Sequence, residues 1–310
     1  MSRDGKKFQV FIAGSNFEDI TPEVLASFAT HLFHSKGKVS PATVTNAMVA
    51  VRDPISFGFG VEIDRREWDL LKASFFLQRP PTTAAQPNWS LSKVLDLLQS
   101  DKFQVNPSIN DLFLRALFLI ALATGHRVSQ LAALLRCPEF TKFGPELSSV
   151  TLATRPSFLA KNERPDHRFS PVIVPAWTVE GEPHPLCPVR ALSSYLDASI
   201  TPNSQALWLN PQSGRPLKTA ELAKCLVSLI HMADPTSEPK AHQVRKYASS
   251  LAFFRCFDVE SVRKAGQWSS STSFVTRYLV PHLSDSQCVA MFSCPPSSSR
   301  RKGGPVLRTS

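Results

Sequence analysis

The sequence is poor in the residues that build metal sites and nucleotide-binding loops. Six cysteines are scattered along 310 residues, without a CxxC pair and without a histidine at metal-ligand spacing, so we expect neither a zinc site nor a disulfide framework. The cysteines are instead expected to be reduced and to serve as small apolar residues. Only 12 glycines are present, and no GxGxxG or GxxxxGK(S/T) pattern occurs, which argues against a nucleotide cofactor.

Long hydrophobic runs are also missing. The longest apolar run, Ala116 to Ala123, is far shorter than the roughly 20 residues that span a bilayer. The opening MSRDGKKFQV lacks the apolar centre of a signal peptide. We therefore expect a soluble, intracellular protein without a membrane partner.

The residues that are plentiful indicate a folded, basic protein. Hydrophobic residues make up 43% of the chain, which is enough for a buried core and excludes wholesale disorder. Lysine and arginine number 35 against 25 acidic residues, a formal net charge of +10. Such an excess suits a polyanionic partner such as nucleic acid. At this length we expect about two domains.

The first eighty residues carry the start signals of helices. Thr21-Pro22-Glu23 combines a cap, a proline at the first helical position and an acidic first turn, and Ser40-Pro41 repeats the signal. A third helix is predicted over 65–76. The segment 78–87 is rich in proline, threonine and alanine and cannot continue a helix. We therefore predict a helical domain over 1–80 and a linker over 81–88.

A larger domain is predicted over 89–293, followed by a disordered basic tail over 294–310. Strands over 150–154 and 169–174 flank a polar stretch and predict a β-hairpin with a long tip. A third short strand is expected over 206–209, closed by a turn over 210–214. The expected fold class is mainly α with a small antiparallel β-sheet (α+β). Helices are predicted over 91–98, 110–123, 188–196, 219–232, 241–257, 258–265, 271–279 and 285–292.

Two segments place cations where an anion would stabilise them. Arg127 follows a nearly apolar helix that ends at Gly125, and an arginine between apolar helices is costly to bury without an anionic partner. An internal salt bridge explains it equally well. His242 and Arg245 are three residues apart and share one helix face, so both can point at one ligand. A solvated helix face is the alternative.

Two further segments carry residues of chemical interest. Trp268 is followed ten residues later by Tyr278, one of only three tyrosines. A core or interface position is the alternative for this tyrosine. Lys161 stands at the tip of the predicted hairpin, where a solvated lysine is the ordinary interpretation.

Taken in order, Arg…Lys…His-x-x-Arg…Trp…Tyr resembles the active site of tyrosine recombinases, the phage-integrase-type family of site-specific DNA recombinases. ATGHRVSQL resembles the first arginine box of that family, AHQVRKYASSLAF its HxxR box and SFVTRYL its nucleophile box. PNWSLSKVLDLL, SFLAKNE and GQWSSSTSFVTRYL are similar to recombinases of DIRS-type and Crypton-type eukaryotic mobile elements. The resemblance covers about 88–290, whereas the first domain matches only in size and helical character.

The resemblance implies a role for each of these residues. Arg127 and Arg245 would hold the non-bridging oxygens of the scissile phosphate, and His242 and Trp268 would add hydrogen-bond donors. Tyr278 would attack phosphorus and leave a 3′-phosphotyrosine bond. The covalent bond conserves the phosphodiester energy, so no ATP is required. With this many cationic donors no metal is required either, and no cofactor is expected.

The resemblance also assigns a general acid. It implies that Lys161 protonates the departing 5′-oxygen, and Lys142, in the preceding loop, is the alternative. Two departures from the family pattern stand out. Gln130 occupies the place of the usual acidic residue, and we expect this change to tune the activity of the site without abolishing it. Trp268 and Tyr278 are one residue further apart than is common.

The resemblance also implies partners. Two domains would form a C-shaped clamp around double-stranded DNA that carries inverted or direct repeat sites. The protein would be a homo-oligomer, a dimer on one site and a tetramer in synapsis, with a helix over 285–292 docking on a neighbouring protomer or on its own domain. Phosphate contacts are expected from Arg155, Arg164, Arg168 and Arg215.

The expected function is a site-specific recombinase or transposase that integrates or excises a mobile element. The eukaryotic similarity implies action in the nucleus, with the basic stretch Arg300 to Lys302 as weak local support. Two alternatives remain open. One is DNA relaxation like that of a type IB topoisomerase, and the other is a non-cutting DNA-binding protein derived from a recombinase.

Overall fold

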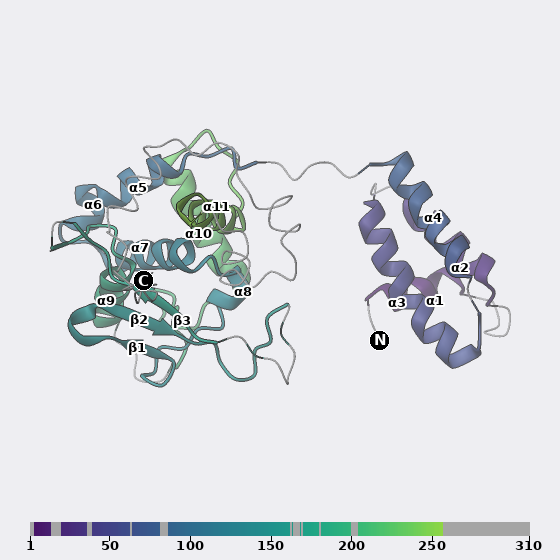
Figure 1. Cartoon of the computed structure of the whole chain (residues 1–310), viewed down its shortest axis with the longest axis horizontal. Coiled ribbons are helices and arrows are strands. Elements are labelled where there is room, and N and C mark those ends of the chain that lie inside the picture. The colour runs from purple at the N-terminus through teal and green to yellow at the C-terminus, as the bar shows by residue number, and fades with distance from the viewer. Residues whose placement is uncertain are drawn as a thin grey trace, which may run out of the picture. The chain divides into compact units, whose positions relative to one another are not determined.

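The computed structural model describes residues 3–13, 20–35, 39–62, 64–80, 86–161, 163, 168, 170–179, 181–199 and 204–256. The chain divides into two compact units, Met1–Ala85 and Gln86–Ser310 (Figure 1). Predictions for Arg164, Trp268, Tyr278, the three helices after residue 257 and the basic tail lie outside the described residues. Among the described helices, none has the length and apolar character needed to cross a membrane.

The first unit is a helical assembly, as predicted. Of the two predicted caps, Ser40 accepts a hydrogen bond from the Thr43 amide at 3.2 Å, whereas the Thr21 side chain makes no capping bond. Helix α4 is capped by the Asp64 carboxylate, which accepts from the Glu67 amide at 2.9 Å. Phe28, 1% exposed, packs at the centre of the core. The helices are α1 (Arg3–Phe11), α2 (Pro22–His34), α3 (Pro41–Phe59) and α4 (Arg65–Gln78).

The second unit is built around one nearly apolar helix. Helix α7 (Ile109–Thr124) packs against α9, α10 and α11 and also touches strand β3, so it lies inside the unit (Figure 1). Its side chains from Ala116 to Leu122 are all buried, as its sequence predicts. The other helices are α5 (Leu91–Gln99), α6 (Asp101–Gln104), α8 (Val128–Leu131), α9 (Pro188–Ala198), α10 (Thr219–Ala233) and α11 (Gln243–Cys256).

The predicted β-hairpin is confirmed and belongs to a three-stranded antiparallel sheet. Strand β2 (Ser149–Leu152) pairs with β3 (Val172–Pro175) and with β1 (Thr141–Phe143), in the order β1-β2-β3. A short second sheet joins β4 (Thr178–Val179) to β5 (Glu182–Pro183). The mainly α architecture with a small antiparallel sheet is the fold class expected from the sequence.

Two details of the prediction are wrong. Residues 206–209 form no strand of the sheet, because Ala206 and Leu209 make only isolated bridges, to Leu135 and Pro216. The third strand is β1, so Lys142 lies in a strand and pairs with Thr151, not in a loop. A three-residue strand is too short to show an alternating pattern, which explains why the sequence does not reveal it.

Candidate active site

The site is organised by the turn that ends helix α7. Gly125 closes the helix in the left-handed conformation, with φ 59° and ψ 21°, which glycine adopts without steric cost. Arg127 follows two residues later in extended backbone and caps α8. Its amide donates to Gln130 Oε1 at 3.0 Å. The neutral amide at 130 therefore fixes the backbone of Arg127 in this chain.

Arg245 reaches the same turn from a segment 120 residues away. It lies in the first turns of α11 and is 4% exposed, and its Nη1 donates a hydrogen bond to the Gly125 carbonyl. A β-carbon added at Gly125 would lie 3.6 Å from the Ala248 Cβ, so α11 packs closely on the turn. A solvated helix face is therefore the wrong interpretation for Arg245.

The Arg127 guanidinium has hydrogen-bonding capacity that the described residues leave unfilled. Its Nη1 is buried and has no hydrogen-bond partner among the described residues, and the described ion pairs do not include Arg127. The internal salt bridge considered from the sequence is thus not found in the described part of the chain. A buried cationic donor without a partner favours an anionic ligand.

His126 is close enough to both arginines to feel their charges, and the sequence analysis did not single it out. The side chain is 8% exposed, and burial, followed by the charges of Arg245 and Arg127, lowers its pKa to about 4. The imidazole is therefore neutral at pH 7, and its buried Nδ1 lacks a partner within the described residues. A histidine directly before an arginine in a helix-ending turn is the sequence signal that could have identified it.

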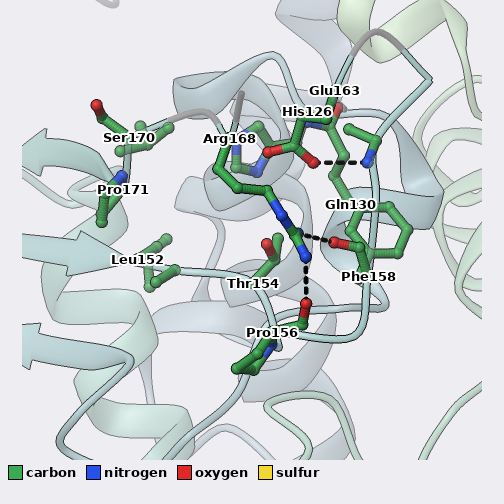
Figure 2. A pocket seen from close by; sticks show the side chains of 13 residues that line it. His126, Gln130, Leu152, Thr154, Pro156, Phe158, Glu163, Arg168, Ser170 and Pro171 are labelled. Atoms are coloured by element: carbon green, nitrogen blue, oxygen red, sulfur yellow. Dashed lines mark hydrogen bonds between the residues drawn. The ribbon is translucent and has the colours of Figure 1, made fainter. Parts of the chain in front are cut away.

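A pocket of about 270 Å³ joins this turn to the β2–β3 hairpin (Figure 2). Arg168 holds one wall in place by donating to the carbonyls of Pro156 and Phe158. Glu163 holds the hairpin tip by accepting from the Ala160 amide at 2.6 Å. The lining includes His126, Gln130, Leu152, Thr154, Phe158, Ala160, Glu163, Arg168 and Ser170.

Lys161 lies in the segment that borders the pocket, and His242 lies in the segment that leads into α11. Lys161 is exposed and directly follows Ala160, which lines the pocket with His126 and Gln130. His242 immediately precedes α11, one turn before Arg245. Its side chain is exposed, as the solvated alternative expects. Desolvation, followed by the charges of Lys246 and Lys240, lowers its pKa, which favours the neutral imidazole.

The two described tyrosines are structural. Tyr247 is 5% exposed and donates to the Trp89 carbonyl at 2.6 Å. Burial raises its pKa to about 12. Tyr195 is buried, donates to the Leu207 carbonyl at 3.4 Å and accepts from the Leu209 amide at 3.0 Å. Within the described residues, no group of three or more potential metal ligands is found.

The fold is similar to those of solved recombinases and integrases. The XerH site-specific recombinase bound to palindromic difH substrate, a post-cleavage complex, aligns with a TM-score of 0.60 and 19% identity over 88% of this chain and 74% of that one. The Tn1549 transposon integrase in complex with transposon right end DNA gives 0.58 and 12% over 94% and 93%. A lambda integrase dimer bound to a COC′ core site gives 0.54 and 14% over 87% and 86%.

At the level of sequence, no family model and no curated protein matches the chain. Each structural similarity covers 87% of this chain or more. They agree with the fold that the arginine and HxxR motifs predict. The chain therefore has the tyrosine-recombinase fold.

Proposed function

We propose that the chain is a site-specific DNA recombinase that cuts and rejoins strands through a covalent 3′-phosphotyrosine intermediate, for integration or excision of a mobile element. The observation that carries the proposal is the meeting of Arg127 and Arg245 at the turn around Gly125, with one buried Arg127 nitrogen left unpaired among the described residues. Two guanidinium groups at one point match the non-bridging oxygens of a phosphodiester.

The chemistry follows from this placement. The two guanidinium groups stabilise the charge that develops on the non-bridging oxygens in the transition state. His126 is neutral and so adds no third positive charge to the pair. In the proposed reaction, the Tyr278 hydroxyl releases its proton to water as its oxygen forms a bond to phosphorus. The bond from phosphorus to the 5′-oxygen breaks, and Lys161 gives its proton to that oxygen. His242 and Trp268 complete the set of donors.

Tyr278 is supported as the nucleophile by elimination. The chain has three tyrosines, and the hydroxyls of Tyr195 and Tyr247 are buried and hydrogen-bonded to backbone. Ionising either phenol would require breaking a hydrogen bond inside an apolar core. Tyr278 is the remaining tyrosine, and the nucleophile box resemblance assigns it the same role.

DNA is the proposed partner. All three reported structural neighbours are described as complexes with DNA or with named DNA sites, and this chain carries a net charge of +10. Among the expected phosphate contacts, Arg155 is exposed, whereas Arg215 is paired with Glu221 and Arg168 holds the hairpin loop. The same proposal includes a clamp formed by the two units, DNA sites that carry repeats, and action in the nucleus. It also includes a dimer on one site and a tetramer in synapsis.

The test is the formation of a covalent adduct on a nicked suicide duplex taken from the terminus of the element that encodes the protein. Incubated without metal and without ATP, the wild-type protein and Tyr247→Phe should form an adduct that survives a denaturing gel, and Tyr278→Phe should form none. An adduct that persists in Tyr278→Phe would refute the assigned nucleophile. Tight, site-dependent binding without any adduct would favour the non-cutting DNA-binding protein, and adducts on DNA of any sequence would favour a topoisomerase.

A further inference from the structure

The point where the chain enters the second unit is hydrogen-bonded to the helix that carries Arg245. Trp89 is three residues past the start of that unit and is 3% exposed. Its indole Nε1 donates to Gln243 Oε1 at 3.0 Å, and its carbonyl accepts from the Tyr247 hydroxyl at 2.6 Å. The Trp89 and Tyr247 rings meet edge to face with centroids 4.6 Å apart. Trp89 thus contacts α11 at two residues one turn apart.

Gln243 is the first residue of α11, and its side chain joins three segments. It is 4% exposed, and its Oε1 accepts from the Lys240 amide at 2.8 Å as well as from Trp89. The backbone amide of Gln243 donates to the Lys240 carbonyl at 2.8 Å. The turn that leads into α11 is therefore closed by the same side chain that Trp89 holds.

A second set of bonds fixes the residue next to Trp89. The Ser90 amide donates to Asp234 Oδ2 at 3.1 Å, and Lys93 Nζ lies 2.8 Å from Asp234 Oδ1. Asp234 follows helix α10 directly. The end of the linker is consequently tied to the segments on both sides of the turn that precedes α11.

We propose that Trp89 and Gln243 are positioning residues for the recombination site, a proposal that rests on the proposed function. Gln243 stands between His242 and Arg245 in the sequence. Its hydrogen bonds therefore set the direction in which the His242 side chain points and the position of Arg245 along α11. Neither Trp89 nor Gln243 touches the phosphate. They act by holding the first turn of α11 against the Gly125 turn, where a displacement of about 1 Å costs on the order of 100-fold in rate.

The structure offers a matched control for this proposal. Trp208 belongs to the same core and is 2% exposed, but its indole Nε1 has no hydrogen-bond partner among the described residues. Trp89→Phe and Trp208→Phe therefore remove the same side-chain volume, and only the first removes a hydrogen bond to α11. Gln243→Met removes the acceptor of that same hydrogen bond.

The experiment compares these variants by hydrogen exchange and by cleavage. We expect amides of residues 243–247 to exchange about 10-fold faster in Trp89→Phe and Gln243→Met than in Trp208→Phe. Adduct formation at saturating protein should slow by about 10- to 100-fold in the same two variants, with unchanged affinity for the DNA. The double variant Trp89→Phe/Gln243→Met should be no slower than Gln243→Met, because that variant alone already removes the bond to Trp89 together with the bond to Lys240.

The outcomes separate this inference from the proposed function. If exchange in the first turn of α11 is the same in Trp89→Phe and Trp208→Phe, the positioning role is refuted. If exchange rises but the cleavage rate falls no further than in Trp208→Phe, the bond holds the helix without serving the reaction, and the role is again refuted. If exchange rises as expected while the wild-type protein forms no adduct, the hold on α11 stands and the recombinase function fails.

Discussion

At the scale of single residues, Arg127 shows how charge and hydrogen-bond geometry can be tested apart. A lysine at this position keeps the positive charge but loses the planar fork that fits two phosphate oxygens. We expect Arg127→Lys to slow adduct formation by about 100-fold. The melting temperature should change little, because the described hydrogen bond of Arg127 to Gln130 uses the backbone amide. Single-turnover gels and thermal melts measure the two effects.

Arg136 provides the matched control. It is half-buried, and its Nη2 donates to the Ser199 carbonyl at 3.0 Å and to the Ser199 hydroxyl at 2.7 Å. Arg136→Lys should therefore lower stability and leave the rate unchanged at saturating protein. Equal losses of rate in both variants would contradict a specific role of the Arg127 side chain.

His126 should make the stability of the second unit depend on pH. Its pKa is lowered from 6.5 to about 4 in the folded protein, so below pH 6.5 the unfolded chain binds a proton that the folded chain does not. Stability is therefore lost as pH falls from about 6.5 to about 4, by up to about 3 kcal/mol. Urea denaturation at pH 7 and pH 4.5 measures the loss, which His126→Met should reduce. An equal loss in the variant would show that other groups cause it.

At the scale of elements, the left-handed turn at Gly125 has a counterpart that allows a controlled test. Gly125 has φ 59° and Gly60, at the end of α3, has φ 65°, and a β-carbon at either meets nothing closer than 3.6 Å. Alanine at each position should cost about 1 kcal/mol through backbone strain alone. Only Gly125→Ala should also slow adduct formation, because it shifts the carbonyl that Arg245 binds. Equal rates in the two variants would argue that the turn does not set the site.

Elements with explicit start signals are the ones that the sequence predicts well. Ser40-Pro41 and Thr21-Pro22 begin α3 and α2 as expected, and the apolar run after Asn110 becomes the buried α7. Helix α1 is not predicted, because Gly5 and the charged residues around it leave no apolar residues at helical spacing before Phe8. Periodicity also misassigns 206–209, where an apolar run fills the core without joining the sheet.

The parts of the site are predictable, but their contacts are not. Arg127, His242 and Arg245 stand out because their motifs are local. The hydrogen bond from Arg245 to the Gly125 carbonyl spans 120 positions, and the bond from Trp89 to Gln243 spans 154. Such pairings depend on how helices pack, which no local pattern records. The roles of Trp268 and Tyr278 stay predictions.

At the scale of the whole molecule, the two units have separate hydrophobic cores. The described core residues of the first unit and those of the second form clusters that share no member. We therefore expect calorimetry to show two unfolding transitions instead of one. Leu25→Ala should lower one transition and Leu119→Ala the other, each by about 2–5 kcal/mol. A single transition that both variants shift would show that the units unfold together.

The described candidates for chemistry, Arg127, Lys161, His242 and Arg245, all belong to the second unit. Mutations that accumulate in the first unit leave the hydrogen bonds around the Gly125 turn intact, so the two parts of the chain are free to diverge at different speeds over generations.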